Sequence, residues 1–184
     1  MSHVLRILGI DPGLNRTGYG VIAVEGSRMS LVQAGVIRVP PGALAQRLRA
    51  ILLGLTEVIV ATSPQRVAIE KVFVNINAQA TLLLGQARGA AICAAVAASL
   101  PVNEHSALRI KQAVVGYGGA DKQQVQSMVQ RLLALPQPPV QDAADALACA
   151  ICDAHGTDGR AAASTRARRG AAAWRALGER LLRA

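Results

Sequence analysis

Four carboxylates stand at positions from which they could act together on one substrate. Asp11 ends a short apolar run and is followed at once by Pro-Gly, and Glu70 lies near the end of the apolar segment V-A-I-E-K-V. Asp142 and Asp145 are three residues apart in D-A-A-D, so both point to one face of a helix. Oxygen ligands suit Mg²⁺, and two such ions about 3.5 to 4 Å apart can hydrolyse a phosphodiester. Convergence of these acids predicts that chemistry.

Two of these acids also have an ordinary structural explanation. Asp142 could cap the helix that it begins, because Asp is favoured near a helix N-terminus. Asp11 could only shape a turn, which is a common role for Asp before Pro-Gly. Glu70 resists such an explanation, since an unpaired carboxylate in an apolar strand costs roughly several kcal/mol to bury. The combination of the four therefore favours a functional interpretation.

The elements that must position these acids can be read from hydrophobic periodicity and from Gly and Pro breaks. The pattern predicts three successive strands, a helix, a strand, a helix, a short strand and two final helices. Their expected ranges are 4–10, 19–25, 30–39, 43–62, 66–72, 78–100, 101–104, 122–135 and 140–154. This order predicts an α/β fold with a mixed five-stranded sheet flanked by helices, in which the strand at 66–72 is central because it is apolar on both faces.

Composition points to one domain with a polyanionic partner. A chain of 184 residues suits a single domain, and its net charge of +9 indicates nucleic acid or an acidic surface. Seven arginines and only two acids lie past Gly156, so we expect one folded domain at 1–155, which carries the four acids, and a basic tail at 156–184. The tail is either disordered or helical, and it serves either as a solvated extension or as a phosphate-binding arm.

Other features limit the location and the metal chemistry. The N-terminus shows no cleavable targeting segment, which predicts a cytoplasmic protein. The longest apolar stretch, 78–100, contains two glutamines and an arginine, so we expect a buried helix and no membrane partner. Cys149, Cys152 and His155 form C-x2-C-x2-H without a second ligand pair, which favours core packing of the cysteines, as for Cys93, over a zinc site.

The motifs resemble those of a known family. L-G-I-D-P-G-L-N-R-T-G-Y-G (8–20), A-I-E-K-V-F (68–73), L-G-Q-A-R-G (84–89), I-K-Q-A-V-V-G-Y-G-G-A-D-K-Q-Q-V (110–125) and Q-D-A-A-D-A-L-A (141–148) resemble the RuvC resolvases in order and spacing. The resemblance covers about residues 4 to 155.

The resemblance implies a ribonuclease H-like fold and a homodimer that resolves four-way (Holliday) DNA junctions by paired symmetric nicks in recombination and repair. It implies a metal site on Asp11, Glu70, Asp142 and Asp145, which agrees with the acids found from their positions. We expect two Mg²⁺ per site, replaceable by Mn²⁺, with 5′-phosphate and 3′-hydroxyl ends. The family further implies cooperation with a branch-migration helicase complex of the RuvA and RuvB type.

The resemblance also assigns DNA contacts. It implies that Lys111 and Lys122 bind phosphates near the cut and that Phe73 stacks on an unpaired base. Lysine is a compact phosphate partner, and an aromatic side chain beside a catalytic strand is a plausible stacking platform. Core packing is the alternative for Phe73, and Asp121 before Lys122 could be a helix N-cap. For Tyr117, DNA contact and chance cannot be separated.

Two other functions compete with the nuclease. G-I-D-P-G followed by Thr17 also resembles the phosphate-binding loop of actin-like ATPases and sugar kinases, but those proteins need a second lobe for which this chain has no room. A catalytically silent DNA-binding factor would need only the basic surface. The presence of acids at all four positions argues against such a factor.

Overall fold

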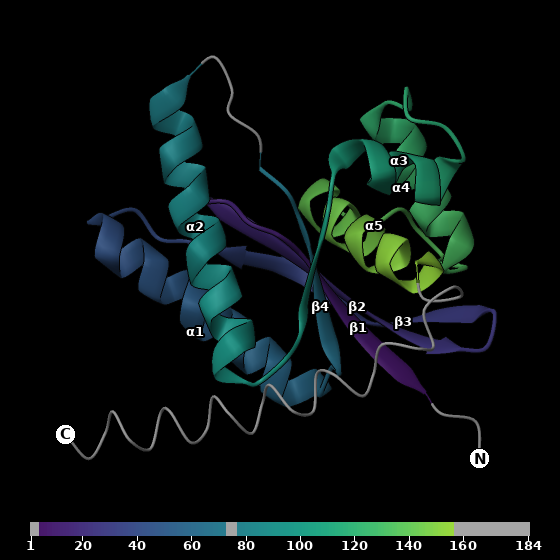
Figure 1. The fold of residues 1–184 in the computed structure, drawn as a ribbon, viewed down its shortest axis with the longest axis horizontal. Coiled ribbons are helices and arrows are strands. Elements are labelled where there is room, and N and C mark those ends of the chain that lie inside the picture. The colour runs from purple at the N-terminus through teal and green to yellow at the C-terminus, as the bar shows by residue number, and fades with distance from the viewer. Residues whose placement is uncertain (1–3, 73–76, 157–184) are drawn as a thin grey trace.

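The computed structural model of the chain describes residues 4–72 and 77–156, built around a five-stranded sheet (Figure 1). The strands are β1 (Leu5–Asp11), β2 (Arg16–Glu25), β3 (Arg28–Arg38), β4 (Arg66–Glu70) and β5 (Val102–His105), in the order β3-β2-β1-β4-β5. β1, β2 and β3 form an antiparallel meander, and β4 and β5 run parallel to β1. The predicted mixed five-stranded sheet is confirmed, and β4 is an interior strand, but β1 rather than β4 stands at its centre.

Helices cover both faces of the sheet. They are α1 (Leu44–Thr62), α2 (Ala78–Ala97), α3 (Ala107–Val115), α4 (Lys122–Leu132) and α5 (Gln141–His155). α1 and α2 lie on one side of the sheet, and α5 lies on the other with α3 and α4 stacked behind it (Figure 1). Strand alternation separates two cores, because Ile7 of β1 packs toward α5 while its neighbours Leu8 and Ile10 pack with α1 and α2.

α3 was not predicted. Its sequence does carry the usual signals: Ser106 caps the N-terminus by accepting a hydrogen bond from the Arg109 amide, Ile110 and Val114 are buried at i, i+4 spacing, and Gly116 ends the helix with a φ of 93°. The helix has only 9 residues, and its apolar stripe is only two residues long. The remaining elements match their predicted ranges to within a few residues at each end.

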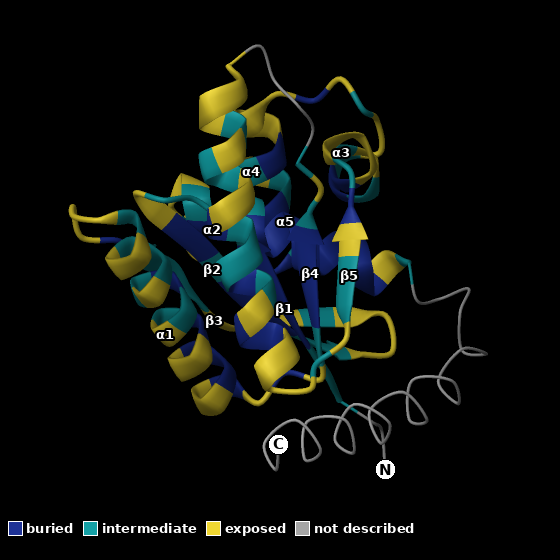
Figure 2. Cartoon of the chain, turned by 60° about the vertical axis from the view of Figure 1, so that its left-hand side comes forward, coloured by how far each residue is buried: buried dark blue, intermediate teal, exposed yellow. Residues whose placement is uncertain are grey.

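α2 is less buried than predicted. Its buried residues are all alanines (Ala87, Ala91, Ala94 and Ala95), and by length and composition alone this helix could cross a membrane, although only 22% of the relevant window is buried. Arg88, near its centre, pairs with Glu104 at 2.7 Å and donates to the Glu70 carbonyl oxygen. α2 therefore packs against α1 and the sheet through a narrow face and leaves its outer face exposed (Figure 2), with the large apolar side chains of Leu82 and Val96 on it.

Candidate active site

Asp11 and Glu70 end two neighbouring parallel strands. Ile10 and Ile69 are paired in the β1–β4 register, so the next residues along, Asp11 and Glu70, stand side by side at the carboxyl edge of the sheet. Strand alternation points both toward α5. A cavity of about 300 Å³ opens at this edge, lined by Asp11, Pro12, Glu70, Lys71, Val72 and Leu84.

Two glycines let α5 approach the sheet closely enough to add its own acids. A Cβ on Gly9 would lie 1.9 Å from the Ala146 carbonyl oxygen, and a Cβ on Gly18 would lie 2.0 Å from the Asp142 carbonyl oxygen. Only glycine permits such contact between helix and strand backbones. The first turns of α5 are thereby pressed against β1 and β2, which places Asp142 and Asp145 beside Asp11.

The charges of the four acids act on one another. Burial, followed by the charges of Asp145, Glu70 and Asp142, raises the pKa of Asp11 to about 7. Burial and the charge of Asp145 raise the pKa of Glu70, and burial, together with the weaker effect of the Asp142 charge, raises the pKa of Asp145. Such mutual effects require the carboxylates to be close in a partly dehydrated environment. The structure thus brings together all four predicted acids.

Three basic side chains partly offset this negative charge. Lys122 Nζ lies 3.6 Å from an Asp145 oxygen, and its charge acts against the raised pKa values of Asp11, Glu70 and Asp145. The charge of Lys111 likewise lowers the pKa of Glu70. Arg16 Nη1 lies 3.6 Å from an Asp142 oxygen, a contact that the sequence did not predict.

Hydrogen bonds of a cap or a turn do not engage the carboxylates of Asp142 and Asp11. The N-cap of α5 is Val140, without a side-chain hydrogen bond, so Asp142 does not cap its helix, although it lies in the first turn, where the helix dipole favours an acid. After β1 the turn is held by Thr17, whose hydroxyl donates to the Gly13 carbonyl oxygen at 2.9 Å. In the described part of the chain the Asp11 carboxylate accepts no hydrogen bond from this turn. Asp11 is therefore free of this turn, and the one ion pair of Asp142 in the described residues is the long contact with Arg16.

The donor set fits hard divalent cations. The acids supply only oxygen ligands. Their negative charge exceeds the positive charge of the nearest basic groups, Arg16 beside Asp142 and Lys122 beside Asp145. Within residues 4–72 and 77–156, no three Asp, Glu, His or Cys side chains already form a group arranged to hold a metal ion. Binding would therefore require the carboxylates to rotate toward a common position, where the bound cations would offset their mutual repulsion.

The other predicted contacts have mixed outcomes. Asp121 caps α4 in a reciprocal capping box with Gln124, as expected, and this fixes Lys122 in the first helical turn, facing the acids. Phe73 and most of the basic tail lie outside the described residues. Tyr117 is half-exposed in the loop between α3 and α4.

The position of Thr17 argues against the ATPase alternative. Thr17 is fully buried, and its hydroxyl is engaged with both the amide and the carbonyl group of Gly13. A phosphate-binding loop needs free donors directed outward, and Thr17 offers none.

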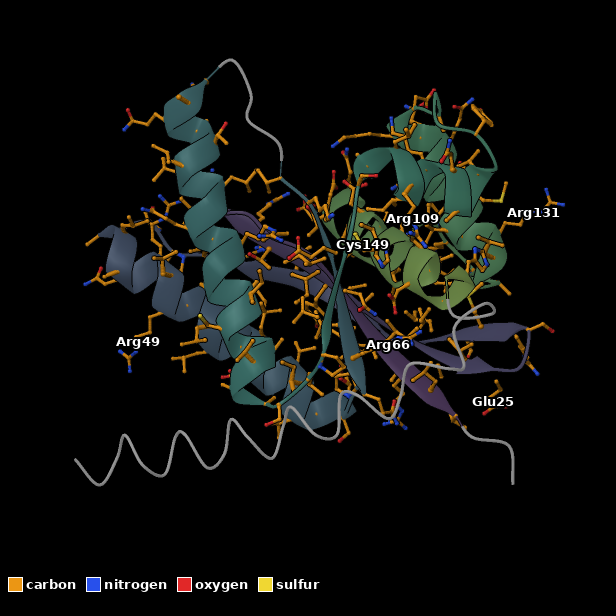
Figure 3. The ribbon with its side chains drawn as sticks, viewed as in Figure 1. Glu25, Arg49, Arg66, Arg109, Arg131 and Cys149 are labelled. Carbon is orange, nitrogen blue, oxygen red and sulfur yellow. The ribbon has the colours of Figure 1, made fainter. Side chains whose placement is uncertain are left out.

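Cys149 and Cys152 pack in the core between α5 and the sheet, as predicted, and Figure 3 shows Cys149 on the inner side of α5. Burial and nearby carboxylates raise the pKa of the Cys149 thiol. His155 instead has its Nδ1 within 3.0 Å of the Ala113 carbonyl oxygen, and Cys93 is exposed on α2, which the packing expectation for it did not foresee.

Comparison with known proteins places this arrangement in one family. The family model described as crossover junction endodeoxyribonuclease RuvC matches residues 7–153. The crossover junction endodeoxyribonuclease RuvC of Aromatoleum aromaticum is 60% identical over 89% of both chains, and that of Azoarcus sp. is 61% identical over 84% of both. Among solved structures, Thermus thermophilus RuvC in complex with a Holliday junction substrate matches with a TM-score of 0.79 and 33% identity, covering 84% of this chain and 96% of that chain. The chain is therefore a member of the RuvC family of crossover junction endodeoxyribonucleases, with the ribonuclease H-like fold that its sheet displays.

Proposed function

We propose that Asp11, Glu70, Asp142 and Asp145 hold two Mg²⁺, for which Mn²⁺ can substitute, and that this site cuts four-way DNA junctions. One observation carries the proposal: Asp11 and Glu70 end neighbouring parallel strands, and the close approach of α5 at Gly9 and Gly18 brings Asp142 and Asp145 to the same edge of the sheet, where burial and the charges of the other three acids raise the pKa of Asp11 to about 7. Bound there, two cations would supply an activated water and stabilise the leaving 3′ oxygen, giving 5′-phosphate and 3′-hydroxyl ends.

The basic groups around the acids would hold the DNA. Lys111 and Lys122 act on the charges of the site from α3 and the start of α4, so a phosphate at the acids would lie within their electrostatic reach. We assign them to phosphates beside the cut. Phe73 follows Glu70 by three residues, and we assign it to stacking on an unpaired base at the junction.

Paired symmetric nicks require two sites related by a two-fold axis, so we infer a homodimer. The outer face of α2 supports it: Leu82, Cys93 and Val96 are exposed there, and their spacing places them on one stripe about 20 Å long. Val96→Arg should shift the mass measured by light scattering from dimer to monomer, because an apolar interface on this face would have to bury an unpaired guanidinium group.

Membership of the family also suggests the domain bounds, the cellular location and the partner complex of this protein. We place the nuclease domain at residues 1–155, with 156–184 as a basic extension, in a cytoplasmic protein of homologous recombination and DNA repair. A branch-migration helicase complex of the RuvA and RuvB type would deliver the junction. The net charge of +9 supports contact with DNA beyond the active site.

The proposal is tested by cleavage of a labelled synthetic four-way junction in Mg²⁺, with linear duplex alongside. Glu70→Gln should abolish nicking while junction binding persists, because the amide keeps the shape of the side chain but not its charge. Glu57→Gln, at an exposed acid of α1, is the matched control and should cut normally.

Paired, ligatable nicks that appear only in the junction and only with the wild type and the control would support the resolvase. Absence of metal-dependent cleavage from any branched substrate, with binding intact, would instead establish a silent DNA-binding factor.

A further inference from the structure

A second cavity lies beside the active site, on the side of β2 and β3. Its volume is about 330 Å³, and it is lined by Arg16, Val36, Arg38, Val140, Gln141 and Asp142. Its lining is distinct from that of the cavity at Asp11 and Glu70, yet it includes Asp142, which belongs to the proposed metal site. The two cavities therefore border the same acid from different directions.

The strand register brings two arginines together in this second cavity. Arg16 at the start of β2 and Arg38 at the end of β3 are direct partners across the antiparallel ladder. Side chains of paired residues lie on the same face of a sheet. That face is the one on which α5 packs, since Gly18, two residues after Arg16, touches the backbone of Asp142. Both guanidinium groups thus line the entrance beside the first turn of α5.

The cavity carries an excess of positive charge. Arg16 is 3.6 Å from Asp142, with 64% of its side chain exposed, so this pair is loose. In residues 4–72 and 77–156, no carboxylate lies within ion-pair distance of Arg38. Two guanidinium groups thus face one carboxylate, that of Asp142, which is also a proposed ligand of the metal ions. Occupation of the metal site would leave both arginines available.

We propose that Arg16 and Arg38 form a binding site for a backbone phosphate of the cut strand, next to the phosphate being hydrolysed. Guanidinium groups match phosphate oxygens in a bidentate fork, and an adjoining pair suits a single anion. The inference rests on the proposed function of the neighbouring acids. It adds that Arg16 exchanges Asp142 for DNA when cations occupy the site, so that metal binding and strand positioning favour each other.

Arg38 gives the sharper test because it has no carboxylate partner to lose. Junction binding is measured for Arg38→Gln in EDTA, where no cleavage occurs, over a range of salt concentrations. We expect affinity to fall about tenfold and the salt dependence to lose about one phosphate contact. Arg49→Gln is the control: Arg49 is exposed on α1, on the far side of the sheet from α5 (Figure 3), and its loss should leave affinity and salt slope unchanged.

A second measurement identifies the phosphate itself. Neutral methylphosphonates are placed singly along the strand around the cut, and binding is measured with the wild type and with Arg38→Gln. At one position the methylphosphonate should weaken the wild type but not the variant, because both changes remove the same contact. Arg38→Lys should retain the salt slope while losing part of the affinity.

Losses that add at every position, or an Arg38→Gln variant that binds like Arg49→Gln, would overturn the phosphate site. Because these readouts need neither metal nor cleavage, they are independent of the junction-cleavage test of the four acids.

Discussion

Helix α5 carries acids at both ends, and the side chains around them differ: basic and hydrogen-bonding groups surround the acid at one end, and further acids surround those at the other. Near its C-terminus, Asp153 is buried, accepts a hydrogen bond from Asn103 at 2.8 Å, lies 2.9 Å from His105 Nε2 and pairs with Arg66. At its N-terminus, Asp142 and Asp145 are partly exposed and face two further acids. Their basic partners, Arg16 and Lys122, are each 3.6 Å away.

The difference separates a structural acid from functional ones. The partners of Asp153 come from β4 and β5, so this carboxylate ties the C-terminal end of α5 to the sheet, where His105 pairs with Glu70 in the β4–β5 register. The acids at the other end repel one another, and that repulsion costs the metal-free protein stability until a cation is bound. Removing an acid should therefore have opposite effects on stability at the two ends.

The largest effect is expected at the structural end. Asp153→Asn should lower the free energy of unfolding by about 3 to 5 kcal/mol, because it removes the negative charge that faces the buried His105 and the largely buried side chain of Arg66. Urea unfolding followed by circular dichroism measures this loss, with Glu57→Gln expected within about 0.5 kcal/mol of wild type. A loss as small as that of the control would mean that Asp153 is not a structural acid.

The opposite sign is expected at the site. In the absence of metal at pH 8, Asp11→Asn should raise the free energy of unfolding by about 1 to 3 kcal/mol, since it removes an ionised group whose pKa is raised to about 7. The same variant should not cut junctions. If Asp11→Asn were instead destabilised like Asp153→Asn, the two ends of α5 would not differ in the way described.

These two ends also predict two pH windows. Asp11 has a pKa raised from 3.8 to about 7, so the folded protein keeps a proton that the unfolded chain releases, and metal-free stability falls as pH rises between those values. The hydrogen bond between His105 and Asp153 is the main cause that raises the pKa of His105 from 6.5 to about 9. The contribution of His105 to stability is therefore complete below pH 6.5 and is lost as pH rises through about 9.

The windows can be separated by substitution. Asp11→Asn should flatten the fall in melting temperature below pH 7, and His105→Gln should flatten the fall above it. Each change corresponds to about 1 to 3 kcal/mol in the free energy of unfolding. Melting is followed at one fixed protein concentration, because association also shifts the transition. An unchanged pH profile in either variant would remove that group from the explanation.

The smallest effect concerns the offsetting lysine. Lys122→Met should lower metal-free stability by less than about 1 kcal/mol, because its side chain is mostly exposed and its pair with Asp145 is long. Its loss should still raise the pKa values of the acids further. A decrease of several kcal/mol, seen in the same urea titration, would show that Lys122 is a structural partner of Asp145.

The sequence was more informative at the site than at the structural end of α5. Asp11 and Glu70 could be found because they end apolar strands, and D-A-A-D displays its spacing directly. Asp153 gives no such signal: its partners lie 48 to 87 residues away, and only the β4–β5 register and the docking of α5 bring them together. The Arg16–Arg38 pair was missed for the same reason, since it depends on the register of β2 and β3.

Thermal unfolding with and without saturating Mg²⁺, at pH 7.5, tests most directly whether the four acids form a cation site. The wild type should melt several degrees higher with Mg²⁺, because a ligand bound only to the folded state stabilises it. Asp11→Asn should melt above the wild type without metal and respond little to Mg²⁺. A wild type that does not respond to Mg²⁺, or an Asp11→Asn variant that melts lower and gains as much from the ion, would contradict the account.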